Sequence, residues 1–236
     1  MPRTNPLRAV FLDVGGTLIE SQPSPAYVYA QVLSKYGPPL RGEQVAPIFQ
    51  AVWTEMTESQ PRGLDRYHLV KGGERAWWGE FVRRVLELLH HPAPWREVLE
   101  ELFAAFAAPG LWHVFPEVRE VLASMRGRGL RLAVISNWDS RLPALLDSLE
   151  LRGFFDDVLV SAIEGVEKPA PAIFQRATAR AGVSAGESLH VGDSPLDDYR
   201  GAESAGMRAL LVDRAGIFGE GYDRVADLRG VDGFLD

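Results

Sequence analysis

The chain has 236 residues, of which 46% are hydrophobic and 24% charged, as in ordinary soluble globular proteins that bury a sizeable core. Its net charge of −7 argues against a general nucleic-acid-binding role, because phosphate backbones require a basic face. The sequence has no cysteine, which excludes disulfides, thiol nucleophiles and thiolate metal sites. No stretch reaches the roughly 20 apolar residues that span a bilayer, and the opening MPRTNPLR lacks the apolar core of a signal peptide. We therefore expect a cytoplasmic protein with neither membrane nor nucleic-acid partners.

The first two predicted strands lie far apart in the sequence. Residues 8–13 are a short apolar run that ends in an aspartate, and the next convincing strand is the LRLAVIS run at residues 130–136. More than a hundred residues separate these strands, whereas a crossover between parallel strands needs about a dozen. An inserted segment must therefore lie between them.

The inserted segment has the periodicity of helices. Helical patterns extend over four stretches of it, residues 24–37, 43–56, 72–89 and 93–110. The first has Ser24 as a helix cap, Pro25 at its first position and Gly37 as a terminator, while Pro47 either kinks the second or starts a new piece. The third repeats apolar residues on one face, namely Trp77, Phe81, Val85 and Leu88. The segment is thus predicted to be a cap of four or five helices.

After the insert, strands and helices alternate with short links. The further predicted strands are residues 157–161, 188–192 and 208–212, each preceded by a helical pattern. Such alternation is typical of a parallel sheet that is covered on both faces. We therefore predict a doubly wound, Rossmann-like α/β core formed by residues 1–20 and 112–236, with an all-helical cap inserted at residues 21–111.

Polar side chains follow four of the predicted strands. Asp13 ends the first, Ser136 and Asn137 end the second, Lys168 follows the third, and Asp193 follows the fourth. Taken singly, such residues are more typical of turns, helix caps or surface corners. Ligands of open parallel sheets, however, bind beyond the carboxyl ends of the strands, so these side chains should converge there. Together they could hold a divalent cation and a phosphate.

The string DVGGT at residues 13–17 is also typical of another phosphate loop, that of actin-like sugar kinases and ATPases. In those proteins the chain returns as an antiparallel strand after the glycines. Here LIESQPSPAYVY follows, with two prolines and a helix start, so a returning strand is not expected. A second nucleotide-phosphate signature is also missing downstream, and we reject this reading.

The ordered series of motifs resembles the haloacid dehalogenase (HAD) superfamily. The residues that carry the resemblance are DVGGT, VISN, EKPAPAIF and HVGDSPLDDYRGAESAGM, within residues 7–20 and about 114–215. A helical insert directly after the first motif is also the layout of one cap type in that superfamily. Within it, the WW pair and the runs GLRLAVISN and LRGFFDDVLVS look most like the haloacid dehalogenase-like hydrolase domain-containing 3 group.

The resemblance implies a nucleophile and a metal site. Asp13 would attack phosphorus and form an aspartyl phosphate. Asp13, the backbone carbonyl of Gly15 and Asp193 would hold Mg²⁺, which neutralises charge as a carboxylate approaches an anionic phosphate.

The resemblance also assigns the residues around the phosphate. Thr17, Ser136 and Asn137 would bind the phosphate or support its loop, and Lys168 would act as a positive charge beside Asp13 and the phosphoryl oxygens. Asp198 would act from outside the ligand set, orienting Lys168 or a water on the metal.

Position 15 departs from the pattern of HAD phosphatases, which have an aspartate there that protonates the leaving oxygen and then activates water. Glycine can do neither, and such acid–base help is typically worth about 10²–10⁴-fold in rate. Glu20 and Asp139 are substitutes by position, although a solvated residue and a helix N-cap are the simpler interpretations. We also expect the turn to use glycine's φ freedom at position 15.

We therefore predict a magnesium-dependent HAD-type hydrolase, a phosphatase with weakened acid–base chemistry that acts on a small phosphorylated metabolite. The first alternative is a non-catalytic HAD-like protein that binds a phosphometabolite or a partner. The second is a 2-haloacid dehalogenase, which needs no proton for its leaving halide. Dehalogenases generally lack the metal ligand of the fourth motif, however, and Asp193 is present here. A monomer or homodimer is expected.

Overall fold

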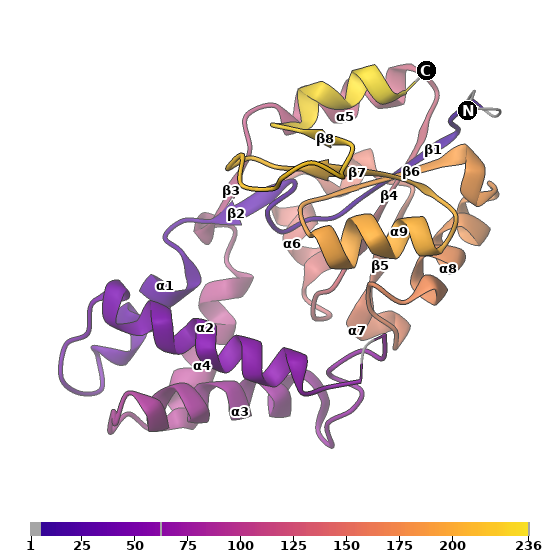
Figure 1. Ribbon diagram of the computed structural model, residues 1–236. Coiled ribbons are helices and arrows are strands. Elements are labelled where there is room, and N and C mark those ends of the chain that lie inside the picture. Colours follow the sequence, from indigo (N-terminus) through magenta and orange to yellow (C-terminus); the bar gives the residue numbers. More distant parts are fainter. Residues whose placement is uncertain (1–5, 62, 236) are drawn as a thin grey trace. The chain divides into compact units, whose positions relative to one another are not determined.

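The computed structural model describes residues 6–61 and 63–235 (Figure 1). Its larger sheet has six parallel strands in the order β5-β4-β1-β6-β7-β8. In chain order they are β1 (Ala9–Leu12), β4 (Arg131–Ser136), β5 (Asp157–Val160), β6 (Ser188–Gly192), β7 (Arg208–Val212) and β8 (Arg224–Val225). Strand β1 lies between β4 and β6, so the sheet is wound outward in both directions from its first strand. The predicted doubly wound α/β core is confirmed.

Helices flank this sheet in the larger compact unit. They are α5 (Val118–Gly127), α6 (Leu142–Ser148), α7 (Ser161–Glu164), α8 (Pro171–Ala181), the π-helix Pro195–Arg200 and α9 (Gly201–Ser204). Short 3₁₀ helices of this unit are Arg152–Phe154, Ala185–Glu187 and Leu228–Phe234, and a further one, Pro109–Leu111, belongs to the other unit described below. Helices α8 and α9 share one buried cluster with Phe11 of β1 and Ile135 of β4. The alternate residues Val10 and Leu12 are equally buried, as expected for a strand covered on both faces.

The chain divides into two compact units, Met1–Glu20 with Val114–Asp236 and Ser21–His113. The second unit contains α1 (Pro25–Leu33), α2 (Gly42–Glu58), α3 (Gly73–Leu88) and α4 (Trp95–Ala107). Its core is rich in aromatic rings, in which Trp77 and Phe81 of α3 contact Trp53 of α2 edge to face. Two short strands, β2 (Ile19–Ser21) and β3 (Trp112–Val114), form a separate small sheet that the sequence did not predict.

Three local predictions about the second unit need correction. Helix α2 runs through Pro47 without starting a new piece, since it begins before the proline, at Gly42, where the Gln44 side chain accepts from the Arg41 N–H at 2.9 Å. Helix α1 ends at Leu33, before the expected terminator Gly37. Leu88 does not belong to the buried face of α3, because it is the last residue of the helix and is 51% exposed. No helix of the described ranges combines the length and apolarity needed to cross a membrane.

The middle and the C-terminal end of α3 should respond differently when a side chain is truncated. Phe81 is fully buried whereas Leu88 is 51% exposed. We expect Phe81→Ala to lower the free energy of unfolding by about 3–5 kcal/mol. Leu88→Ala should change it by no more than about 0.5 kcal/mol. Urea unfolding of the full chain measures both, and comparable losses in the two variants would contradict the packing described for α3.

Candidate functional site

Asp13 stands directly after β1, in the centre of the sheet. Its backbone N–H donates to the Val191 carbonyl of β6 at 2.9 Å, so the sheet pairing continues as far as this residue. The chain then turns sharply, and Gly16 has a positive φ of 75°. A Cβ at Gly16 would lie only 2.4 Å from Oδ2 of Asp193. The glycine therefore permits both the left-handed backbone and the close approach of the turn to Asp193.

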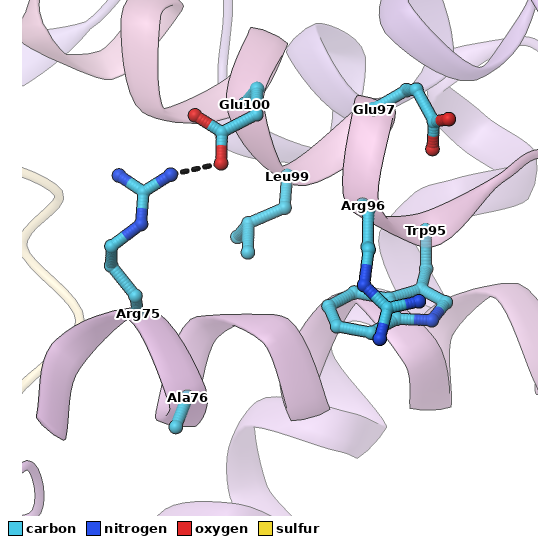
Figure 2. Close-up of a pocket in the computed structure, with 7 residues that line it drawn as sticks. All are labelled: Arg75, Ala76, Trp95, Arg96, Glu97, Leu99 and Glu100. Atoms are coloured by element: carbon cyan, nitrogen blue, oxygen red, sulfur yellow. Dashed lines mark hydrogen bonds and ion pairs between the residues drawn. The ribbon is translucent and has the colours of Figure 1, made fainter. Parts of the chain in front are cut away.

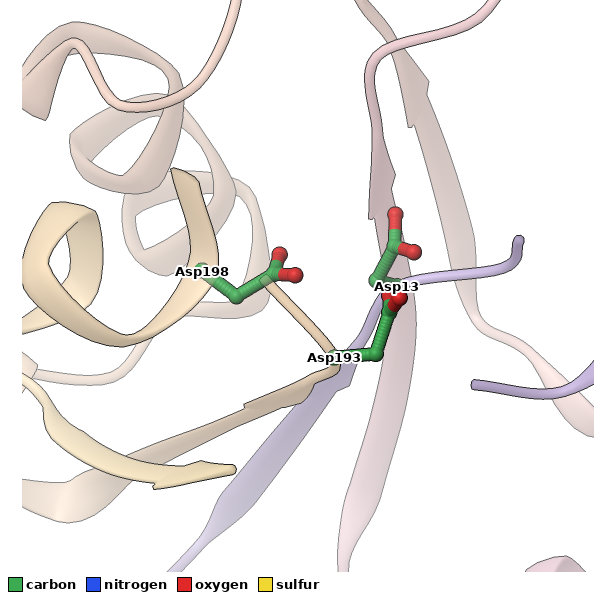
Figure 3. Close-up of side chains that lie close together, drawn as sticks. All are labelled: Asp13, Asp193 and Asp198. Atoms are coloured by element: carbon green, nitrogen blue, oxygen red, sulfur yellow. The ribbon is translucent and has the colours of Figure 1, made fainter. Parts of the chain in front are cut away.

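Asp193 and Asp198 come from the end of β6 and the π-helix that follows it. Ser194 caps this helix, because its hydroxyl oxygen accepts a hydrogen bond from the Asp197 N–H at 3.1 Å. The Ser194 N–H in turn donates to Oδ2 of Asp198 at 2.9 Å. Oxygens of Asp13, Asp193 and Asp198 lie within 4.8 Å of one another (Figure 3). Three carboxylates from two strand ends thus meet in one place.

Lys168 supplies the positive charge of this cluster. Its Nζ donates to Oδ1 of Asp13 at 2.7 Å and to Oδ1 of Asp198 at 2.5 Å, and the residue is 3% exposed. The Ser136 hydroxyl, at the end of β4, donates to the same Asp13 oxygen at 2.9 Å. Both bonds to Asp13 use Oδ1, so Oδ2 is the oxygen that they leave open. The residues predicted at the four strand ends therefore do converge.

The other two predicted phosphate ligands hold parts of the site in place. The Asn137 side chain accepts from the Lys168 N–H at 2.7 Å and donates to the Lys168 carbonyl at 2.9 Å. The buried Thr17 hydroxyl donates to Oδ1 of Asp193 at 3.4 Å. Asn137 thus fixes the backbone that presents Lys168, and Thr17 links the first motif to the fourth. Direct phosphate contacts by either residue stay predictions, as does the role of the Gly15 carbonyl.

The cluster contains three carboxyl groups and one ammonium, and its burial and charges shift the pKa of each of these groups. Burial raises the pKa of Asp13, although Lys168 opposes this effect. Burial, together with the charges of Asp13 and Asp198, raises the pKa of Asp193 to about 7. Burial would raise the pKa of Asp198 too, but the Lys168 ammonium and the His190 hydrogen bond hold it well below its usual range. Burial lowers the pKa of Lys168, yet Asp13 and Asp198 outweigh it, so the pKa is raised and the ammonium persists.

His190, on β6, stabilises the position of Asp198. Its Nε2 lies 2.9 Å from Oδ1 of Asp198, and its ring meets Phe174 edge to face at 5.1 Å. Burial lowers the pKa of the imidazole, although Asp198 opposes this shift, so the ring is neutral near pH 7. A neutral ring beside a carboxylate carries its proton on Nε2 and donates it.

Position 15 is crowded by an aromatic ring. A Cβ at Gly15 would lie 3.2 Å from Cζ3 of Trp138, which follows β4. The positive φ of the turn falls on Gly16 rather than on Gly15, so the expected need for glycine's φ freedom at position 15 is wrong. Steric contact with Trp138, and not backbone strain, is what limits a larger residue there.

Of the two acidic residues considered as substitutes, Asp139 does not replace the missing aspartate. Asp139 is buried and binds the N–H, Nε and Nη2 of Arg141, so both of its oxygens are engaged. It is not the N-cap of α6 either, because Arg141 holds that position and the helix begins at Leu142. Glu20 lies on β2, outside the six-stranded sheet.

A pocket of about 380 Å³ lies elsewhere, between α3 and α4 of the second unit (Figure 2). Trp95 and Leu99 supply apolar lining. Arg75 forms an ion pair with Glu100, and the Arg96 guanidinium lies 4.4 Å from the Trp95 ring. Two charged groups of this pocket thus pair with each other and a third packs on an aromatic ring, whereas the core brings three carboxylates together, so the carboxylate cluster is the candidate site.

The sequence did not identify one group at the site. Arg214, directly after Asp213 at the end of β7, donates to the carbonyl oxygens of Gly16 and Thr17 at 3.2 and 2.8 Å. The rule that ligands gather beyond strand ends would have drawn attention to this position, because β7 neighbours β6 in the sheet.

Known proteins resemble the chain over most of its length. A family model described as haloacid dehalogenase-like hydrolase matches residues 7–206. Haloacid dehalogenase-like hydrolase domain-containing protein 3 of Mus musculus is 34% identical over 209 residues, which are 87% of this chain and 82% of that protein. Phosphoserine phosphatase of Thermus thermophilus is 38% identical over 157 residues, 65% of this chain and 63% of that protein.

A solved structure agrees with the fold. The HAD-hydrolase YfnB from Bacillus subtilis, bound to magnesium, superposes with a TM-score of 0.78 at 18% identity, covering 98% of this chain and 99% of that one. The predicted resemblance is confirmed by the family model and by the relatives. The chain belongs to the haloacid dehalogenase-like hydrolase family.

Proposed function

We propose that the protein is a magnesium-dependent phosphatase that forms an aspartyl phosphate on Asp13 and releases phosphate from a small phosphorylated metabolite. The charge imbalance of the site carries this proposal. With Asp13, Asp193 and Asp198 ionised, Lys168 compensates only one of three negative charges in a largely buried cluster. The remaining charge of about −2 is what a divalent cation balances, and carboxylate oxygens are the ligands that Mg²⁺ prefers.

The residues present fit such an ion. Asp13, Asp193 and the Gly15 carbonyl are the ligands that we propose, and Asp198 is occupied by Lys168 and His190. The raised pKa of Asp193, about 7, comes from its burial and from the charges of Asp13 and Asp198, which Lys168 only partly offsets. When bound, magnesium supplies the positive charge that lets a carboxylate approach an anionic phosphate.

The reaction then needs two displacements. Oδ2 of Asp13 attacks phosphorus while Ser136 and Lys168 hold Oδ1, and the bond from phosphorus to the leaving oxygen breaks. Lys168 would also supply positive charge beside the phosphoryl oxygens. Water next attacks the aspartyl phosphate, which releases inorganic phosphate and restores the Asp13 carboxylate. Both displacements move a proton that the aspartate at position 15 handles in other HAD phosphatases.

Because residue 15 is a glycine, the rate of the first displacement depends strongly on the leaving group. With no side chain to donate a proton, the departing oxygen must leave as an anion or take its proton from solvent. Good leaving groups such as nitrophenolates and carboxylates need little help, whereas alkoxides need much. We therefore infer that activated phosphates are the substrate class that this site turns over.

A non-catalytic binding protein is the second candidate, and the contact between Trp138 and position 15 is the observation that favours it. Such a protein would keep the phosphate pocket while releasing no phosphate. The dehalogenase alternative is less consistent with Asp193, which that chemistry does not need.

A phosphate panel distinguishes these candidates. We expect nitrophenyl and acyl phosphates to be hydrolysed in the presence of Mg²⁺ at least about 10²-fold faster than alkyl phosphates, because only the latter need a general acid. Phosphate release should stop with chelator and with Asp13→Asn. Acid quench should trap phosphate on Asp13, because hydrolysis of the intermediate also lacks its base. Absence of both turnover and trapped phosphate, with ligand binding intact, would establish the binding-protein candidate instead.

Removing one carboxylate should have opposite effects with and without metal. In chelator, Asp193→Asn relieves repulsion and should raise Tm by about 2–4 °C, the shift that about 1 kcal/mol gives in a chain of this size. Because burial and the neighbouring carboxylates raise the pKa of Asp193 from 3.8 to about 7, the wild type loses stability as pH rises between these two values, and the loss is complete above pH 7. The gain should therefore be largest above pH 7 and shrink below it.

With excess Mg²⁺ the order should reverse, since the wild type gains stability from binding and the variant does not. Thermal scans and calorimetric titration measure the two effects. Asp147→Asn removes an exposed carboxylate from α6 and serves as the charge-matched control. Equal Mg²⁺ affinity of wild type and Asp193→Asn would remove Asp193 from the ligand set.

An aspartate introduced at position 15 needs space beside the Trp138 ring. Gly15→Asp alone should raise alkyl phosphatase activity by less than the full general acid–base factor of about 10²–10⁴, because Trp138 occupies the adjoining space. Gly15→Asp combined with Trp138→Phe, whose ring is smaller, should raise it further. Steady-state kinetics of the single and double variants measure the gain, with Trp138→Phe alone as control. A double variant no better than Gly15→Asp would show that Trp138 is not the obstacle.

A further inference from the structure

Arg214 joins several parts of the core around the turn that follows Asp13. Its backbone is fixed by Asp213, whose N–H donates to the Val225 carbonyl at 2.8 Å and whose carboxylate accepts from the Ile217 N–H at 2.9 Å. The Arg214 side chain is 22% exposed, so the guanidinium is largely enclosed by the groups that it binds.

The Arg214 guanidinium forms hydrogen bonds with the backbone of the turn that follows Asp13. Nε donates to the Gly16 carbonyl at 3.2 Å, and Nη2 donates to the Thr17 carbonyl at 2.8 Å. Because each peptide unit is planar, holding two successive carbonyls fixes the orientation of both peptide planes and of the N–H groups opposite them. The two carbonyls belong to the peptide units Gly16–Thr17 and Thr17–Leu18, which follow the unit that carries the Gly15 carbonyl. Their orientation therefore also limits where the Gly15 carbonyl can lie.

Two further residues keep the guanidinium in place. Glu117, which is 2% exposed, accepts from Nη2 of Arg214 at 2.7 Å. The Phe115 ring lies 3.5 Å from the guanidinium carbon, and the Phe115 N–H donates to the Leu18 carbonyl at 3.1 Å. A buried carboxylate and an aromatic face orient the planar fork of arginine, which a lysine ammonium cannot reproduce.

Asp193 lies against the same two residues that Arg214 binds. The Thr17 hydroxyl donates to Oδ1 of Asp193 at 3.4 Å, and Oδ2 of Asp193 would lie 2.4 Å from a Cβ at Gly16. There is thus no room for a Cβ between Asp193 and this turn. A shift of the turn would change the contacts of Asp193, and with them the separation of Asp13 and Asp193, which directly follow the neighbouring strands β1 and β6.

We propose that Arg214 is a positioning residue, which holds the Gly16–Thr17 turn against Asp193 and so sets the geometry of the Asp13–Asp193 carboxylate pair. Arg214 touches neither carboxylate and acts only through the turn. The expected effect on Mg²⁺ affinity rests on the proposed function. The effect on the position of the turn does not, and it can be measured without any activity.

The test compares Arg214→Lys with a matched control, Arg119→Lys, in the full chain. Arg119 also donates to two successive backbone carbonyls, those of Leu149 and Glu150, at 2.7 and 3.1 Å. Its partners belong to the end of α6 and the turn after it, not to the carboxylate cluster. The two substitutions remove the same kind of interaction and keep the same charge, so a general loss of stability should affect both.

Hydrogen exchange of the metal-free protein gives the first readout. The N–H groups of Leu18 and Ile19 both donate to the Val14 carbonyl and report whether the turn is closed. Arg214→Lys should speed their exchange by at least about tenfold, the effect of losing bonds worth more than 1.4 kcal/mol, and Arg119→Lys should not. Glu117→Gln, which loosens the guanidinium without removing it, should give a smaller increase and serves as the second variant where Arg214→Lys does not fold.

Calorimetric titration with Mg²⁺ gives the second readout. We expect Arg214→Lys to weaken Mg²⁺ binding by about 10- to 100-fold, as for other groups that orient metal ligands indirectly, while Arg119→Lys leaves it unchanged. Unchanged exchange in Arg214→Lys, or equal changes in the two arginine variants, would overturn the positioning role. If the wild type binds no Mg²⁺, the proposed function fails, and exchange alone decides the role of Arg214.

Discussion

The buried contact of Lys168 with Asp13 and Asp198 is the interaction on which the site depends. It joins the end of β1, the segment after β5 and the π-helix after β6, and it is almost fully removed from water. An ammonium between two carboxylates offsets the desolvation of all three groups only where their geometry is held closely. The Asn137 amide holds the Lys168 backbone, and His190 and the Ser194 N–H hold Asp198. Most polar contacts of the site therefore support this one ion-pair network.

The network leaves a negative excess on one side, at Asp13 and Asp193. Burial raises the pKa of both carboxyl groups and neighbouring carboxylates add to the shift, which is a cost to the folded protein and at the same time an affinity for a cation. Stability and binding are thus two aspects of the same charge distribution. The close contact of Gly16 with Asp193 confines the excess to a small volume, where its effect on a cation is greatest.

Much of this organisation could be predicted from the sequence, because parallel strands place their carboxyl ends at one edge. A polar residue after each of β1, β4 and β6 was enough to infer that Asp13, Ser136 and Asp193 meet, and the long gap after the first strand indicated the insert. The rest depends on packing that no local pattern records. The exposure of Leu88 follows from the end of its helix, and the Trp138 contact with Gly15 joins residues more than a hundred positions apart. Arg214 also lies just beyond a strand end, but the sequence did not identify it. Its partners are backbone carbonyls, which a pattern of side chains cannot reveal.

Gly15 separates two parts of the chemistry that HAD phosphatases combine. The proposed nucleophile Asp13 and Lys168 are present with their supporting hydrogen bonds, while residue 15 has no side chain that could move a proton. A Cβ at Gly15 would lie 3.2 Å from Cζ3 of Trp138, and this ring carbon can neither give nor take a proton. In the proposed reaction, both displacements therefore depend on chemistry outside the side chain of residue 15: a leaving group that departs unaided, and a water that loses its proton to solvent.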